Sequence, residues 1–298
     1  MSAIIIDGKK ISSEMKDKLK IEIEDFKRKN KITPGLAVIR IGDDPASLVY
    51  VRNKRKMCEE LGMISYEENP SADIKEEDVL LMIKKYNNNP FIHGILVQLP
   101  LPSHIQTDKV IQTIDPRKDA DGFHPVNLGL LLAGVPNLVP CTPAGCAYIL
   151  DASGVKVDGK TVVIIGRSLI VGKPLANLLL LKAPNRNATV IVCHSHTPDI
   201  KKFTRQADIL IAAIGRAGII KGDMIRPGAV VIDVGVNKVG EKISAKTGKP
   251  VPVLKGDVEF DEAKEVASMI TPVPGGVGPM TISFLMQNTL IAARNLTK

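Results

Sequence analysis

Short apolar runs rich in β-branched residues alternate along this chain with segments in which apolar residues recur every three or four positions. The runs predict six strands, at residues 36–41, 92–97, 161–165, 189–193, 209–214 and 229–234. A helical spacing precedes the first strand, with apolar residues at Ile11, Met15, Leu19, Ile23 and Phe26. Strands that alternate with helices form parallel sheets covered by helices, so we expect an α/β fold.

Proline and glycine divide this pattern into two parts. The stretch from 113 to 143 is rich in both and predicts a domain junction, after which the strands form a Rossmann-type series. A last helix, at about 279–295, is long enough to return to the first domain. We therefore expect a first domain of residues 1–138 plus 279–298, a Rossmann-type domain of residues 139–278 and a ligand cleft between them.

Composition narrows the class of protein. With 44% hydrophobic residues, no apolar run near the roughly 20 residues of a membrane span and no secretory signal pattern, the chain is expected to be cytoplasmic. A net charge of +8 fits nucleic acid, but 3% aromatic residues and no tryptophan leave few surfaces for stacking bases. Small anionic ligands fit the charge equally well. Four scattered cysteines, even with His194 and His196, match no zinc spacing, so no metal is expected.

A glycine turn follows the predicted strand at 161–165 and leads into a helical segment. It begins at Gly166-Arg167-Ser168 and ends at Gly172, and such a turn places backbone N–H groups and a helix N-terminus against a phosphate. Ser168 stands where the common dinucleotide fingerprint has glycine, and Pro174 stands where a Walker A loop needs serine or threonine. A nucleotide is the favoured ligand, and a Rossmann-type domain without one is the alternative.

The end of the next predicted strand, at 189–193, bears on which nucleotide would bind. A Rossmann domain that holds a ribose 2′-hydroxyl has a carboxylate there, but this chain has His194, Ser195 and His196. The missing carboxylate, together with Arg167, favours a 2′-phosphate and hence NADP.

A candidate for proton transfer lies on the helix predicted at 46–61, where Ser47, Tyr50 and Lys54 share one face. A phenol beside an ammonium group can lower the lysine pKa or hold its protonation state. Gln98 ends a strongly apolar strand, and Asp121 in the junction could pair with an amidine-like ring edge. The alternatives are a solvated lysine, a polar strand end and an ordinary Asp-Gly turn.

Three glycines and two prolines fall within Pro274-Gly275-Gly276-Val277-Gly278-Pro279, directly before the last helix. This density predicts a stiff, bare loop against which a ligand lies. A tight turn that leads into a proline-initiated helix is the alternative.

These motifs, in this order, resemble the bifunctional methylenetetrahydrofolate dehydrogenase/methenyltetrahydrofolate cyclohydrolase family over nearly the whole chain. The stretches that carry the resemblance are Tyr50-Val51-Arg52-Asn53-Lys54, Gln98-Leu99-Pro100-Leu101-Pro102, Lys118-Asp119-Ala120-Asp121-Gly122, Pro140-Cys141-Thr142-Pro143, Gly166-Arg167-Ser168 with Val171-Gly172-Lys173-Pro174, and residues 274–281.

The resemblance implies NADP-dependent oxidation of 5,10-methylenetetrahydrofolate, hydrolysis of the methenyl product to 10-formyltetrahydrofolate, and a homodimer. It implies that Lys54 is the main catalytic residue and that Tyr50 and Gln98 position it. The implied folate contacts are Ser47, Tyr50, Lys54, Val97, Gln98, Leu99, Asp121, Pro274, Gly275, Gly276, Val277 and Gly278. The implied NADP contacts are Gly166, Arg167, Ser168, Ser195 and Val236.

Two departures from the family's usual pattern stand out. His196 replaces an arginine or lysine that many members carry, which bears on the preference for NADP over NAD, and residues 181–187 form a longer segment that we expect to be a surface loop. An amino-acid or shikimate-type dehydrogenase, a basic nucleic-acid-binding protein and a dehydrogenase without cyclohydrolase activity are the competing hypotheses. The first leaves the Gln98 segment and the closing glycines unexplained, and Tyr50, Lys54 and Gln98 argue against the last.

Overall fold

The computed structural model describes residues 2–43, 45–243, 248 and 250–297, and it describes no side chains at residues 45–47, 49 and 50. The chain forms two compact units. The first, called here the six-stranded unit, comprises Met1–Ser12 and Thr142–Thr281; the second, the three-stranded unit, comprises Ser13–Cys141 and Ile282–Lys298. Within the described ranges, no helix is both long and apolar enough to span a membrane.

The six-stranded unit contains one fully parallel sheet with the strand order β1-β11-β8-β7-β5-β6. Its strands are β1 (Ile4–Ile5), β5 (Thr161–Ile165), β6 (Thr189–Cys193), β7 (Ile209–Ala212), β8 (Val230–Asp233) and β11 (Met269–Ile270). The expected Rossmann-type parallel sheet is therefore confirmed. Because all of its strands run the same way, their carboxyl ends lie along one edge, where ligands of such sheets bind.

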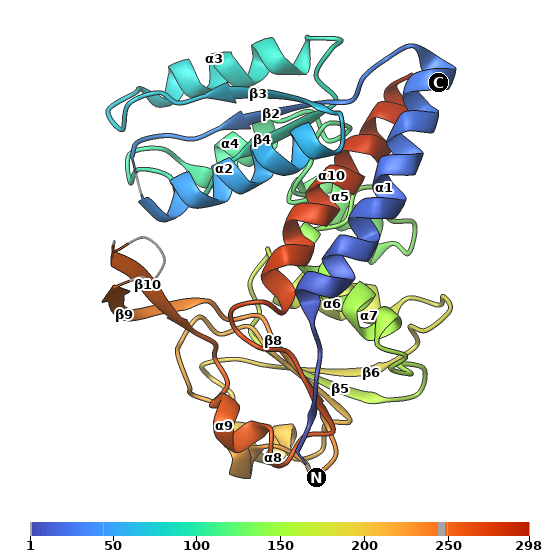
Figure 1. Cartoon of the computed structure of the whole chain (residues 1–298), viewed down its shortest axis with the longest axis vertical. Helices are drawn as coiled ribbons and strands as arrows, with labels where there is room; N and C mark the ends of the chain where they lie inside the picture. Colours follow the sequence, from blue (N-terminus) through green and yellow to red (C-terminus); the bar gives the residue numbers. More distant parts are fainter. Residues whose placement is uncertain (1, 44, 244–247, 249, 298) are drawn as a thin grey trace. The chain divides into compact units, whose positions relative to one another are not determined.

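Helices cover both apolar faces of this sheet. Residues of α8 (Ile200–Thr204) and α9 (Phe260–Ala263), with the 3₁₀ turn Gly222–Met224, pack against one buried cluster on the strands. Helices α6 (Cys141–Ala152) and α7 (Gly172–Leu180) lie on the other side of the sheet (Figure 1). An antiparallel hairpin, β9 (Asn237–Ile243) with β10 (Pro250–Lys255), was not predicted; β9 is polar and largely exposed, and β10 contains two prolines and is mostly half-buried.

The three-stranded unit contains a parallel sheet with the order β3-β2-β4. Its strands are β2 (Gly35–Ile39), β3 (Ile64–Glu68) and β4 (Gly94–Val97), and its helices are α1 (Gly8–Asn30), α2 (Pro45–Glu60), α3 (Glu76–Asn87), α4 (Thr107–Thr113), α5 (Pro125–Leu132) and α10 (Val277–Leu296). Side chains of α3 and α4 pack on one face of the sheet. Figure 1 shows α3 and α2 on opposite sides. The α/β class expected for this unit is confirmed.

The bounds of the two units differ from the sequence-based division in three places, and in one of them the difference is small: the six-stranded unit ends at Thr281 rather than at residue 278. Residues 1–12 belong to the six-stranded unit, because Ile4 and Ile5 pair with Met269 and Ile270 of β11. The stretch from 113 to 143 is not one long junction. It contains α5, and the change of unit falls between Cys141 and Thr142, at the start of α6.

Candidate functional site

The turn after β5 folds back closely on the strand. Gly166 has φ +132°, and a Cβ atom there would lie 2.2 Å from the carbonyl oxygen of Ala213. A Cβ on Gly172 would lie 2.0 Å from the carbonyl oxygen of Gly166. Only glycine fits both positions, so the sequence dictates this narrow turn at the carboxyl end of the strand.

The turn leaves the start of α7 available to a ligand. No side chain caps this helix, and the Ser168 hydroxyl instead accepts a hydrogen bond from the N–H of Val171 at 3.2 Å. Arg167 and Ser168 are exposed. Of the N–H groups in the first turn, that of Lys173 donates to the carbonyl of Ser168, and Pro174 has none. The N–H of Gly172, the positive end of the helix dipole and the guanidinium group of Arg167 together suit an anion such as a phosphate of a dinucleotide.

The end of β6 lies beside this turn, since the N–H of Gly166 donates to the carbonyl of Cys193 at 2.8 Å. His194 Nδ1 accepts the N–H of His196 at 3.2 Å, which assigns the ring proton to Nε2. Burial lowers the pKa of His194, and the nearby Arg167 and His196 lower it further. His194 is therefore neutral at pH 7, Arg167 supplies a positive charge at this end of the sheet, and Ser195 is exposed in the same loop as His194.

A buried lysine lies at the carboxyl end of the sheet in the three-stranded unit. Lys54 is 7% exposed, and its Nζ donates to Gln98 Oε1 at 2.8 Å. Gln98 follows β4 directly, and its Nε2 donates to the carbonyl of Leu99 at 2.7 Å, which turns the amide oxygen toward the lysine. Burial lowers the pKa of Lys54, and the charge of Asp121 opposes this effect. The ammonium group is thus easier to deprotonate than one in water.

Asp121 provides the carboxylate of the same site. Burial raises its pKa to about 6; Lys54 lowers it and Asp119 raises it. Asp119 lies two residues earlier and serves the loop itself, because it accepts hydrogen bonds from the N–H groups of Gly122 and His124 and from Asn127 Nδ2. One carboxylate therefore holds the loop, and the other is left to interact with Lys54.

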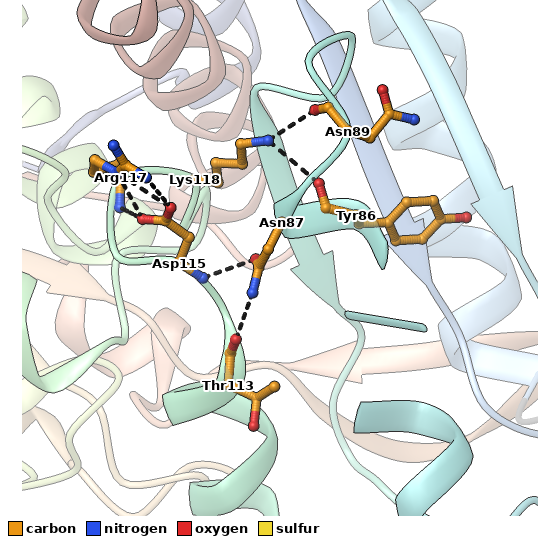
Figure 2. A network of polar contacts seen from close by, with 7 residues as sticks. All are labelled: Tyr86, Asn87, Asn89, Thr113, Asp115, Arg117 and Lys118. Carbon is orange, nitrogen blue, oxygen red and sulfur yellow. Dashed lines mark hydrogen bonds and ion pairs between the residues drawn. The ribbon is translucent and has the colours of Figure 1, made fainter. Parts of the chain in front are cut away.

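A second buried lysine ties this loop to the end of α3 (Figure 2). Lys118 Nζ donates to the carbonyls of Tyr86 and Asn89 at 3.3 and 2.8 Å, where the helix dipole favours a cation. Asn87 adds two further bonds, donating to the carbonyl of Thr113 at 2.7 Å and accepting the N–H of Asp115 at 2.9 Å. The backbone at Lys118 and Ala120 then pairs with Ile95 of β4. The position of Asp121 is fixed through these contacts.

Two groups near Lys54 were not predicted as part of the site. The thiol of Cys141 contacts the carbonyl of Ala120 at 3.3 Å, and burial raises its pKa well above the usual value, so it is neutral. Asn288 of α10 donates to the carbonyls of Ala120 and Val139 at 2.9 and 2.8 Å. Asn288 could have been noticed in the sequence, because it is a polar residue within the apolar run of the last helix.

The proline- and glycine-rich segment is shorter as a loop than expected. Helix α10 begins at Val277, so Val277 and Gly278 form its first turn and only Pro274–Gly276 precede it. Gly276 packs against the start of α1, where a Cβ on Gly8 would lie 1.8 Å from its carbonyl oxygen. Pro274 is exposed. The alternative interpretation, a turn leading into a helix, describes the local backbone.

The remaining predicted residues divide into three groups. Val97 is buried at the end of β4, and Leu99 lines a small cavity of about 10 Å³ that Asp119, Asp121 and Phe123 also border. Val236 is 46% exposed. The side chains of Ser47 and Tyr50 lie outside the described residues, so their relation to Lys54 stays a prediction. In the part of the chain that the structure describes, no three His, Cys, Asp or Glu side chains are placed to hold a metal ion, and all four cysteines are buried and free.

Comparison with known proteins relates both units to one family. Residues 6–121 match the catalytic domain of tetrahydrofolate dehydrogenase/cyclohydrolase, and residues 140–297 match its NAD(P)-binding domain. The chain is 53% identical over 294 residues to the bifunctional protein FolD of Syntrophobacter fumaroxidans and 54% identical over 294 residues to that of Bacillus pumilus. These alignments cover 99% of this chain and 98% and 99% of the relatives.

Solved structures agree with this relationship. The bifunctional FolD enzyme of Campylobacter jejuni is 44% identical with a TM-score of 0.89, and each chain is 99% covered. The Trypanosoma brucei enzyme, solved with NADP and an inhibitor, is 40% identical with a TM-score of 0.92 and covers 99% of this chain and 98% of its own. The chain belongs to the tetrahydrofolate dehydrogenase/cyclohydrolase family.

Proposed function

We propose that this chain oxidises 5,10-methylenetetrahydrofolate with NADP and then hydrolyses the methenyl product to 10-formyltetrahydrofolate, with Lys54 at the centre of the hydrolysis. The observation that carries the assignment of Lys54 is its buried ammonium group, 2.8 Å from Gln98 and coupled to Asp121. The test is a spectrophotometric assay with methylenetetrahydrofolate and each nicotinamide cofactor, followed by the decay of methenyl absorbance. Absence of both reactions would refute the proposal.

NADP, when bound, supplies the acceptor for the hydride that leaves the one-carbon bridge, so the oxidation needs no protein nucleophile. We assign its phosphates to the uncapped start of α7 and to the turn at Gly166, Arg167 and Ser168, with Ser195 and Val236 as further contacts. The close backbone approach at Gly166 and Gly172 is the feature that fits a pyrophosphate.

In the hydrolysis, water attacks the methenyl carbon, protons leave the attacking oxygen, and the bond from that carbon to N5 breaks as N5 takes up one of them, so that one proton is released in all. Because burial lowers the pKa of Lys54, its amine exchanges a proton more readily than that of an exposed lysine. Gln98 holds Nζ by accepting one hydrogen bond, and its own amide is fixed by Leu99. Tyr50 as a second positioning group, and Ser47, Val97, Leu99 and residues 274–278 as folate contacts, stay predictions.

We expect the KM for folate to depend on the ionisation of Asp121. An ionised carboxylate accepts two hydrogen bonds from a ring edge, whereas a protonated one does so less well. Since the pKa of Asp121 is about 6 and above its ordinary 3.8, the carboxylate is ionised above pH 6 and protonates below it. The KM should therefore rise as pH falls through 6.

Steady-state kinetics between pH 5 and pH 8 test this expectation, with Asp121→Asn as the variant that should lose the pH dependence. A wild-type KM that stays constant across this interval would contradict the role assigned to Asp121.

We expect Arg167 to set the preference for NADP over NAD. A guanidinium group paired with a 2′-phosphate contributes roughly 1.5–3 kcal/mol, so Arg167→Gln should reduce kcat/KM for NADP about 10- to 100-fold with little change for NAD. Lys182→Gln, in the exposed segment after α7, is the control. Equal efficiency of the wild type with the two cofactors would refute this assignment, and His196 would then be the residue to examine.

We also propose a cytoplasmic homodimer without nucleic-acid or metal partners, in line with the family resemblance. Sedimentation of the purified protein tests the oligomeric state, and a purely monomeric species at micromolar concentration would contradict it. Any affinity for nucleic acid should be weak and fall steeply with salt.

A further inference from the structure

Two buried aspartates at the carboxyl edge of the six-stranded sheet have no part in the contacts described so far. Asp233 ends β8 and is 4% exposed, and Asp257 follows β10 and is fully buried. In the described part of the chain their partners are N–H groups rather than cations. Burial of a carboxylate is unfavourable without such partners, so we infer that each carboxylate holds the backbone of the loops that donate to it.

The carboxylate of Asp257 accepts hydrogen bonds from the N–H groups of three successive residues in the loop after β7. Its Oδ2 accepts from Ile214 and Gly215 at 2.5 and 2.9 Å, and its Oδ1 accepts from Arg216 at 2.9 Å. Successive N–H groups that converge in this way form an anion-binding nest, and here the anion is a side chain of the protein itself. A fourth donor, Asn237 Nδ2, reaches Oδ1 at 2.9 Å from the start of β9.

Asp233 holds Asp257 in place. Its Oδ1 accepts the N–H groups of Gly235 and Asp257, and its Oδ2 accepts that of Val258, all at 3.0 Å. The backbone packs closely against Asp257, because a Cβ atom on Gly235 would lie 2.1 Å from Asp257 Oδ1. The two carboxylates thus join the loops that follow β7, β8 and β10.

These contacts bear on Val236, a predicted NADP contact. The residue before it, Gly235, is held by Asp233, and the residue after it, Asn237, is held by Asp257. Val236 itself is 46% exposed. Because β5, β7 and β8 are parallel neighbours, this loop lies at the same edge of the sheet as the turn at Gly166.

We propose that Asp257 is a positioning residue for NADP: its carboxylate is the internal anion that shapes the loops after β7 and β8 for the cofactor. The inference rests on the proposed dehydrogenase function and adds a residue that does not itself touch the cofactor. It accounts for a buried carboxylate with four donors at the edge where the nucleotide binds.

The test uses Asp257→Asn, which keeps the shape of the side chain but replaces one acceptor oxygen by an N–H₂ group. At least one backbone N–H then loses its acceptor, and we expect the KM for NADP to rise at least about tenfold. Hydrolysis of methenyltetrahydrofolate, supplied directly, should keep its kcat within about twofold, because Lys54 lies in the other unit. Fluorescence titration with NADPH measures the affinity independently of folate chemistry.

Asp261→Asn is the matched control, because Asp261 is 82% exposed and pairs only with the nearby Lys264 at 2.7 Å in the described structure. It should leave the KM for NADP unchanged. A parallel loss of both activities in Asp257→Asn, with unaltered NADPH affinity in the folded fraction, would show a general structural role and overturn the proposal.

If Asp257→Asn does not fold, Asn237→Ala is the second variant, because it removes the side-chain amide that donates to Asp257 and to the carbonyl of Lys255 and leaves the carboxylate in place. A several-fold weaker NADPH affinity supports the proposal, and an unchanged affinity overturns it. A failure of the proposed function can be told apart from a failure of the role assigned to Asp257. If the proposed function is wrong, the wild type lacks dehydrogenase activity, but the NADPH titrations still measure the effect of Asp257 on cofactor affinity.

Discussion

Replacement of Lys54 by methionine is expected to reduce hydrolysis of methenyltetrahydrofolate by about 10³-fold, the scale of a lost general acid or base. Methionine has nearly the length of lysine but no ionisable group, so it keeps the packing of α2 while removing the hydrogen bond to Gln98. Binding of folate should survive when it is measured well above pH 6, because Asp121 remains, although the loss of Lys54 raises the pKa of this carboxyl group. The measurement is the decay of methenyl absorbance together with the equilibrium binding of a folate ligand.

The matched control is Lys56→Met on the same helix. Lys56 has a side chain that is 73% exposed and lies 3.8 Å from Glu60, so its loss should leave both activities intact. Hydrolysis near the wild-type rate in Lys54→Met would overturn the assignment of Lys54. Thermal unfolding of both variants separates a catalytic defect from a folding defect.

Replacement of Gly166 by alanine should abolish NADP binding and destabilise the six-stranded unit by about 3–5 kcal/mol. The new Cβ would lie 2.2 Å from the carbonyl oxygen of Ala213, a backbone atom that cannot rotate away, and φ +132° is strained for any side chain. Urea denaturation measures the stability, and titration with NADPH measures the affinity. Folate binding, which we assign to other residues, should persist in the folded fraction.

Gly240→Ala in β9 serves as the control for this prediction, because a Cβ there would meet no described atom within 4 Å. It should change neither stability nor affinity appreciably. Wild-type affinity for NADPH in Gly166→Ala would mean that the cofactor does not bind at this turn.

The strands that could be predicted from sequence are those with apolar runs. Five of them, β2, β4, β5, β7 and β8, are buried almost throughout, whereas β6 is an edge strand with partly exposed side chains. The predictions at 161–165 and 189–193 match β5 and β6 residue for residue, and three of the other runs contain the shorter strands β4, β7 and β8. The run at 36–41 overlaps β2, which begins one residue earlier, at Gly35, and ends at Ile39. Strand β3 could not be found in this way. Its sequence Ile-Ser-Tyr-Glu-Glu is polar because it forms the edge of its sheet, where its side chains are half-buried.

The site shows a similar division. Lys54, Gln98 and Asp121 could be proposed because their side chains are chemically unusual at the ends of predicted elements, and the structure brings Lys54 and Gln98 into contact. Lys118 and Asp257 could not be given a role from sequence. Their partners are backbone groups about 30 to 40 positions away, and no periodicity or composition records such a pairing.

The first strand of the chain has a consequence for how the protein can be made and divided. Ile4 pairs with Met269, so β1 cannot join the six-stranded sheet during synthesis until nearly the whole chain has left the ribosome. A gene fragment encoding only residues 142–281 would lack β1 and expose the backbone of β11 to other chains. To express the dehydrogenase half by itself, the N-terminal dozen residues would have to be grafted back onto it.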